Sequence, residues 1–131
     1  MTDSTKHKIL VVDDELTVCR SIRQALIRED YEVDMALSGE EALRKEAERH
    51  YDVMIVDLMM PGLSGMDLLK SLKAQDPKSK IIMVTGYPTM KNTIQAMQLG
   101  AFDFLPKPFL PSDLRGVVAR ALADENEPAG G

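Results

Sequence analysis

The chain has 131 residues, which suits one compact domain and leaves little room for a second. Hydrophobic residues make up 44% and charged residues 28%, so the composition excludes wholesale disorder. The net charge is −5 and no Lys/Arg cluster is present, which argues against direct nucleic-acid binding because phosphate neutralisation supplies most of that affinity.

Cysteine content and hydropathy bear on the cellular compartment in which the protein is expected. Cys19 is the single cysteine, so neither an internal disulfide nor a Cys-based metal site can form, which fits a reducing cytoplasm. Apolar runs are only a few residues long and the N-terminus is polar, so no membrane span and no signal peptide are expected. We therefore expect a cytoplasmic protein without membrane contact.

The first expected element is a buried strand. Residues 9–12 form a continuous apolar run that stops at Asp13, and an uninterrupted run indicates cover on both faces, as in a parallel sheet. Apolar residues at helical spacing follow and predict a helix that ends near Asp30. Residues 31–36 alternate more and favour an edge strand.

The rest of the chain repeats this order. Ser38 and Glu41 have the spacing of a capping box, and the helix they open is expected to run to about His50. Residues 53–56 form a second buried strand, which stops at Asp57. The remaining expected elements are a helix capped by Ser64 and ended by Pro77, a strand over 80–84 before Thr85, a helix over 89–99 ended by Gly100, a strand over 103–106, and a helix from Pro111 to about 123.

The alternation of strands and helices predicts an α/β fold. Strands separated by helices form βαβ units, whose right-handed crossovers place helices on both faces of a parallel sheet. We expect one domain over residues 7–123, with an N-terminal tail over 1–6. The acidic, Pro- and Gly-containing residues 124–131 are expected to be a tail or the start of a linker.

Polar side chains follow the expected strands at their carboxyl ends. Asp13 and Asp14 follow the first strand, Asp57 the third and Thr85 the fourth, while Lys107 comes after the fifth. The functional crevice of an open α/β sheet lies beyond these ends, so the fold should gather the five side chains.

Such a cluster suits phosphoryl transfer. Three carboxylates raise one another's pKa values unless a cation compensates, and oxygen ligands alone indicate a hard ion such as Mg²⁺, with Mn²⁺ as a substitute. A carboxylate can attack phosphorus and form an aspartyl phosphate. Taken singly, each residue is better explained as a turn former, a helix cap or a surface charge. Only the joint pattern at four strand ends favours the functional interpretation.

Four segments together carry a family resemblance: VVDDE at 11–15, VDLMMPG at 56–62, VTG at 84–86 and LPKPF at 105–109. In this order they resemble the signature blocks of response-regulator receiver domains of two-component signalling. The resemblance covers about residues 7–123 and implies a flavodoxin-like (βα)5 fold, a doubly wound parallel sheet with strand order 2-1-3-4-5. Residues 100–109 look most like receivers of nitrogen-regulator-type activators that work with sigma-54.

The resemblance implies the phosphorylation site. Asp57 matches the phosphoacceptor. Asp13 and Asp14 match the acidic pair that binds Mg²⁺ together with Asp57, and the backbone carbonyl of Met59 matches the remaining protein ligand.

The resemblance also implies a switch. Thr85 matches the hydroxyl that turns toward the phosphoryl group, and Lys107 matches the lysine that pairs with it, with a cis peptide bond to Pro108. Phe104 occupies the switch-aromatic position, where many receivers carry Tyr, so it lacks the hydroxyl that could bond a backbone carbonyl.

Signalling expectations follow from the same resemblance. A sensor histidine kinase would supply the phosphoryl group, and the domain would promote only its own phosphorylation and dephosphorylation. The surface from about Met90 to Leu122 would then change and favour a homodimer through the fourth and fifth helices and the last strand. The output is expected to be transcription control through a domain outside this chain; the alternative is a stand-alone receiver in a phosphorelay. Met59 and Tyr87, which flank the site, predict self-dephosphorylation over minutes or longer.

Three other functions fit parts of the pattern. An FMN-binding flavodoxin would need a phosphate cradle where residues 13–15 carry three negative charges. A dehalogenase-type phosphatase would need a second Asp two residues after its nucleophile, whereas residue 15 is Glu. A degenerate receiver that folds but is never phosphorylated is disfavoured because every acidic, hydroxyl and lysine position is intact.

Overall fold

Strands and helices alternate five times over residues 6–124, the part of the chain that the computed structural model describes. Residues 1–5 and 125–131, which make up most of the two expected tails, fall outside it. The elements are β1 Lys8–Val12, α1 Leu16–Ile27, β2 Glu32–Ala36, α2 Gly39–Glu48, β3 Val53–Asp57, α3 Gly65–Gln75, β4 Lys80–Thr85, α4 Met90–Gln98, β5 Asp103–Pro106 and α5 Pro111–Ala123.

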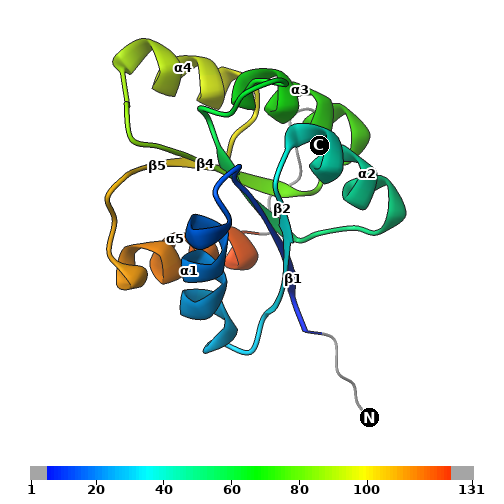
Figure 1. Ribbon diagram of the computed structural model, residues 1–131, viewed down its shortest axis with the longest axis vertical. Coiled ribbons are helices and arrows are strands. Elements are labelled where there is room, and N and C mark those ends of the chain that lie inside the picture. Colours follow the sequence, from blue (N-terminus) through cyan, green and yellow to red (C-terminus); the bar gives the residue numbers. More distant parts are fainter. Residues whose placement is uncertain (1–5, 125–131) are drawn as a thin grey trace.

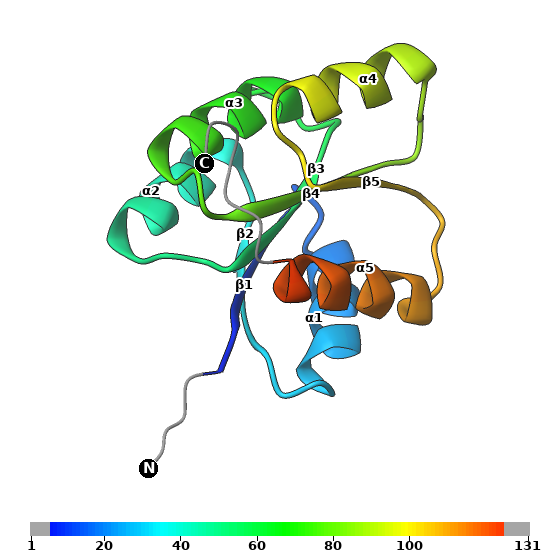
Figure 2. The ribbon, with the colours of Figure 1, turned by 180° about the vertical axis from the view of Figure 1, so that it is seen from behind.

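The strands form one parallel sheet in the order β2-β1-β3-β4-β5, which confirms the expected flavodoxin-like topology and the edge position of β2. Helices α2, α3 and α4 cover one face, and α1 and α5 cover the other (Figures 1 and 2). This three-layer arrangement follows from right-handed crossovers, which return each helix over the sheet.

The sheet is buried on both faces, which explains its uninterrupted apolar strands. In β1, Leu10 and Val12 pack in the core beneath α2, α3 and α4, whereas Ile9 and Val11 pack against α1 and α5. The same alternation holds in β3 and β4. An apolar side chain is therefore needed at every position, not at every second one.

Helix starts follow the expected capping residues. Ser38, Ser64 and Thr89 each accept a hydrogen bond from the backbone N–H three residues later. The capping box at α2 differs in one bond, because Glu41 accepts from the N–H of Leu37 and not from that of Ser38. Gly100 follows α4 with φ +105°, as expected of a helix-ending glycine. None of the described helices is long and apolar enough to span a membrane.

The strand register brings the predicted site residues to one edge of the sheet. Val12 lies beside Val56, so Asp13 follows next to Asp57. Strands β3 and β4 each run one residue further than predicted, and Asp57 and Thr85 are their last residues. Both residues therefore belong to the sheet itself, which restrains their backbone more than a loop would.

Candidate functional site

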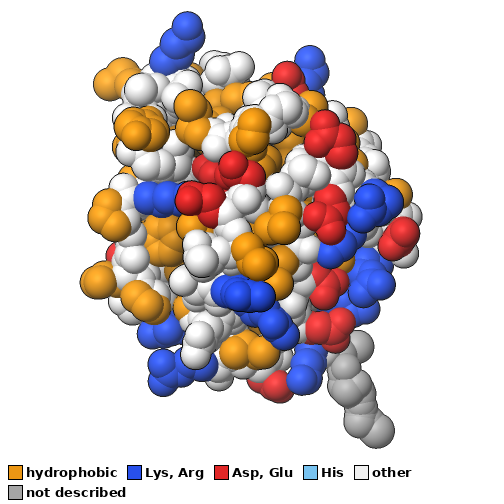
Figure 3. Space-filling view, in the orientation of Figure 1, with side chains coloured by type: hydrophobic (Ala, Val, Ile, Leu, Met, Phe, Trp, Pro, Cys, Tyr) orange, Lys and Arg blue, Asp and Glu red, His pale blue; other side chains and the backbone are white. Residues whose placement is uncertain are grey.

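The three predicted carboxylates meet at the carboxyl edge of the sheet. Asp13, Asp14 and Asp57 each offer an oxygen atom within 4.8 Å of the others. Asp13 is 2% exposed and Asp57 7%, while Asp14 is open to solvent. Acidic side chains gather beside a basic one on the face seen in Figure 3, near the upper end of β1 in Figure 1. The site, called the Asp57 pocket below, is thus an acidic cluster with two buried carboxylates and one exposed.

Asp57 is held and electrostatically strained at the floor of this pocket. Its Oδ1 accepts a hydrogen bond from the N–H of Met59 at 3.1 Å. Burial, and to a smaller degree the negative charge of Asp13, raises the pKa of Asp57 to about 6, against the opposing effects of that hydrogen bond and of Lys107. Repulsion between carboxylates was the expected cause, but burial contributes more.

Lys107 reaches the pocket from the end of β5. Its Nζ lies 3.2 Å from Asp13 Oδ2 and 3.8 Å from Asp57 Oδ2, so one ammonium group serves two carboxylates. The peptide bond between Lys107 and Pro108 is cis, as the resemblance implied. The lysine therefore stands where it can meet negative charge added to Asp57.

Thr85 ends β4, one residue beyond the partner of Asp57 in the sheet, and is bonded to a surface loop. Its side chain is fully buried, and Oγ1 accepts a hydrogen bond from the N–H of Tyr87 at 3.1 Å. Phe104 is only partly buried and packs at the margin of the core beneath α4. Tyr87 and Met59 are exposed beside the site. Asp13, Asp14, Asp57 and Lys107 thus lie together, whereas Phe104 packs against the core.

The donor set fits a hard divalent cation. The ligand atoms are carboxylate oxygens, and Mg²⁺ binds through a few carboxylates while keeping several waters. Two of the three carboxylates are buried, and within residues 6–124 Lys107 is the one basic side chain that forms an ion pair with them. The residual negative charge therefore favours a cation.

Gly65 is a structural part of the site that the sequence analysis did not single out. A Cβ atom at this first residue of α3 would stand 2.5 Å from Leu58 Cα and 2.8 Å from the carbonyl oxygen of Asp57. The start of α3 is therefore packed directly against the backbone that carries Asp57. In the sequence, the one feature that could have predicted this contact is the presence of a glycine directly after the capping residue Ser64.

Comparisons with known proteins agree with the geometry. The family model of the response regulator receiver domain matches residues 9–119. The transcriptional regulatory protein ResD of Bacillus subtilis is 39% identical over 123 residues, which cover 94% of this chain and 50% of ResD. The regulatory protein AtoC of Escherichia coli is 34% identical over 116 residues, covering 88% of this chain and 25% of AtoC. This chain thus spans half or less of these curated relatives.

A solved receiver structure is also similar to this chain. The beryllofluoride-activated NtrC4 receiver domain, determined in solution as a dimer, superposes with a TM-score of 0.85 at 31% identity, covering 88% of this chain and 96% of that one. Together with the family match, this likeness excludes the flavodoxin and phosphatase alternatives.

Proposed function

The chain belongs to the response regulator receiver family, and from that membership we propose that Asp57 accepts a phosphoryl group from a sensor histidine kinase in the cytoplasm. The observation that carries the proposal is the convergence of Asp13, Asp14, Asp57 and Lys107 in one pocket. The receiver then controls transcription through an output domain of the nitrogen-regulator type outside this chain.

Asp57 supplies the nucleophile. A carboxylate oxygen attacks phosphorus, the bond from phosphorus to the donor histidine nitrogen breaks, and that nitrogen takes up a proton as it leaves. The hydrogen bond from the N–H of Met59 fixes one oxygen of Asp57 and leaves the other, Oδ2, on the side of Lys107. Oδ2 is therefore the oxygen that attacks.

The neighbouring groups prepare the pocket for added negative charge. The three carboxylates and the backbone carbonyl of Met59 would hold Mg²⁺, which would supply charge neutralisation. Lys107 pairs with the new phosphoryl oxygens, and the buried Thr85 hydroxyl donates a further hydrogen bond to them. The domain thereby promotes its own phosphorylation and its slow dephosphorylation.

The movement of Thr85 couples the pocket to the surface of α4. Its backbone partner Tyr87 lies in the loop that leads into α4, and Phe104 fills the space that the hydroxyl leaves. Met90, Ile94 and Met97 are exposed on α4, and hydrophobic side chains gather there in Figure 3. Apolar surface of this kind marks interaction sites. The proposed output is a homodimer through α4, β5 and α5, as the dimeric NtrC4 receiver suggests.

Intact-mass spectrometry after incubation with acetyl phosphate tests the acceptor. The expected result is a gain of one phosphoryl group that requires Mg²⁺ and is lost in Asp57→Asn. Asp14→Asn should slow the gain without abolishing the acceptor. A gain that persists in Asp57→Asn would show that the nucleophile is another residue, and no gain in the wild type would point to a degenerate receiver.

Sedimentation analysis with and without beryllofluoride tests the dimer. We expect the mass to double on activation, and Ile94→Glu on α4 to prevent the change. Ile27→Glu on α1 is a matched control, because Ile27 is 48% exposed and Ile94 50%. An unchanged mass in the activated wild type would refute the proposed output surface while leaving the phosphoacceptor untouched.

A further inference from the structure

A second cluster of ionisable side chains lies at the opposite edge of the sheet from Asp57. Glu46 is in the last turn of α2, His50 is in the loop before β3, and Asp76 ends α3. The five residues of β3, which span about 13 Å at about 3.3 Å per residue, lie between this edge and Asp57. The cluster therefore takes no part in the site described above.

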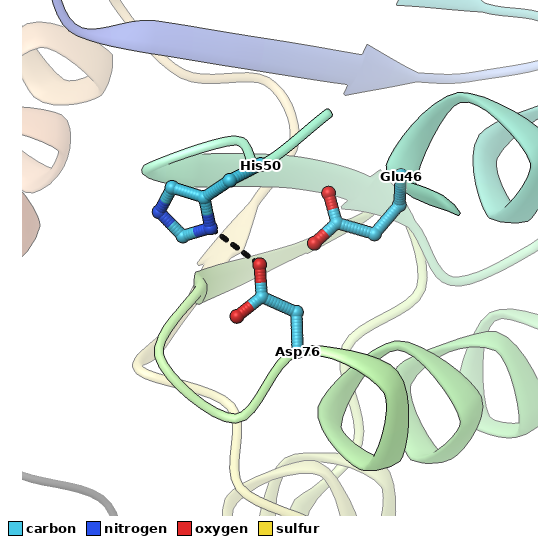
Figure 4. Close-up of side chains that lie close together, drawn as sticks. All are labelled: Glu46, His50 and Asp76. Atoms are coloured by element: carbon cyan, nitrogen blue, oxygen red, sulfur yellow. Dashed lines mark hydrogen bonds and ion pairs between the residues drawn. The ribbon is translucent and has the colours of Figure 1, made fainter. Parts of the chain in front are cut away.

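Glu46 is the unusual member of this cluster. It is 6% exposed, and within residues 6–124 neither of its buried carboxyl oxygens has a hydrogen bond of normal geometry. Its side chain points toward Asp76 and His50 (Figure 4). Burial and the proximity of Asp76 raise the pKa of Glu46 to about 8, although the nearby backbone N–H of Tyr51 acts in the opposite direction. A buried carboxyl without a well-formed hydrogen bond is stabilised by a proton or a cation.

The surroundings of the cluster are negative. The carboxyl ends of α2 and α3 both lie here, and helix carboxyl ends carry partial negative charge. In the described part of the chain, neither Glu46 nor Asp76 forms an ion pair with Lys or Arg; Asp76 pairs with His50. Lys73 is the lysine on the neighbouring turn of α3, but its ammonium group donates to the carbonyl oxygens of Pro77 and Ser79.

His50 is oriented as a metal ligand would be. Its Nδ1 faces Asp76 in the cluster, while Nε2 lies 3.4 Å from Asp52 Oδ1. Asp52 is itself fixed, because its Oδ2 accepts a hydrogen bond from the N–H of Lys8 at 2.8 Å. Ligand histidines commonly give their second nitrogen to a carboxylate in this manner, which sets the tautomer and the ring orientation.

We propose that Glu46, Asp76 and His50 Nδ1 form a binding site for a zinc-class divalent cation. The three donor atoms lie within 4.8 Å of one another, and zinc bonds of about 2.0–2.1 Å place tetrahedral ligands about 3.3 Å apart. Small side-chain shifts, mainly of the half-exposed His50, therefore close the site. His50 and Asp52 line a hollow of about 420 Å³ that Glu46 and Asp76 do not line, so solvent reaches the cluster from the side of the half-exposed His50.

The donor set distinguishes this site from the one at Asp57. One imidazole with two carboxylates suits Zn²⁺, whereas three carboxylates suit Mg²⁺. Excess Mg²⁺ should therefore occupy the Asp57 pocket and leave the Glu46–His50–Asp76 cluster available to zinc. The proposal stands independently of phosphorylation.

Calorimetric titration of Zn²⁺ into the 131-residue chain with Mg²⁺ in excess tests the site. We expect one equivalent to bind, and His50→Gln and Glu46→Gln each to weaken binding at least tenfold. Asp52→Asn should weaken it about tenfold by releasing the His50 ring. His7 is the other histidine of the chain, and its Nδ1 lies 3.8 Å from Asp52 Oδ2, so His7→Gln should weaken binding less than Asp52→Asn does. Asp13→Asn should leave zinc affinity unchanged.

Two further readouts separate loss of a ligand from loss of fold. Circular dichroism checks each variant, and the nitrogen resonances of His50 should show coordination through Nδ1. Zinc should also raise the urea midpoint of the wild type but not of His50→Gln. The proposal would be overturned if the wild type did not bind zinc. It would also be overturned if binding were lost in Asp13→Asn or His7→Gln but retained in His50→Gln. Glu46 would then be protonated in the folded protein.

Discussion

Asp57→Asn is expected to stabilise the metal-free domain, although it removes the proposed phosphoacceptor. The ordinary pKa of this carboxyl is 3.8, and its environment raises it to about 6. Because the folded state then holds its proton more tightly than the unfolded chain does, stability falls as pH rises through the window from 3.8 to 6. At about 1.36 kcal/mol per pKa unit, the ionised Asp57 lowers the free energy of unfolding above that window by about 3 kcal/mol.

Asparagine keeps the oxygen that accepts from the N–H of Met59 and removes the charge, so most of this cost should disappear. Urea unfolding in EDTA at pH 8 should show the variant to be about 1–3 kcal/mol more stable, with the difference shrinking to about 1 kcal/mol near pH 4.5. Saturating Mg²⁺ should also reduce the difference, because the cation compensates the wild-type charge.

Asp14→Asn provides the control for a general effect of net charge. Asp14 is exposed, so its removal should change stability by less than about 1 kcal/mol. If Asp57→Asn were no more stable than the wild type at pH 8, or if the gain were independent of pH, the pocket would not store the electrostatic strain described above.

Three further predictions address the packing around the site. Gly65→Ala should cost about 3 kcal/mol in urea unfolding, because the new methyl group meets the backbone of Leu58 at 2.5 Å; a loss below 1 kcal/mol would show that α3 can shift. Thr89→Ala should cost about 1 kcal/mol, since its hydroxyl accepts from the N–H of Asn92 at 3.0 Å, and an unchanged midpoint would show that this cap does not stabilise α4. Burial raises the pKa of Cys19 to about 11. Its reaction with a disulfide reagent at pH 8 should therefore be at least about 100-fold slower in the folded protein than in urea, and equal rates would show that the thiol is not buried.

Much of the fold was predictable because the strands are buried on both faces. Residues 9–12 and 53–56 are too short and too apolar for surface helices, and each stops at a polar residue. The strand order followed from the family resemblance and not from periodicity. The predicted ends differed by one residue at Asp57 and Thr85, since the ladder hydrogen bonds that include them leave no mark on hydrophobicity.

The site was less fully predictable. Asp13, Asp57 and Lys107 converge as predicted because parallel strands end at one edge. The raised pKa of Asp57 was not predictable from the sequence, since burial depends on how neighbouring loops cover that carboxyl. The Glu46–His50–Asp76 cluster left no motif either, because Glu46 and His50 belong to one connection and Asp76 to the next.

The position of Lys107 bears on how fast the receiver can respond. Its ammonium group already lies between Asp13 and Asp57, so this part of the neutralising charge, unlike the proposed Mg²⁺, does not have to come from solvent when the charge on Asp57 grows. Transfer of the lysine between partners is a side-chain rotation of picoseconds to nanoseconds, whereas rearrangement of helices takes microseconds to milliseconds. If the proposed function holds, we therefore expect the delay between phosphorylation and the change at α4 to come from the backbone around Tyr87 and not from Lys107, which is in place beforehand.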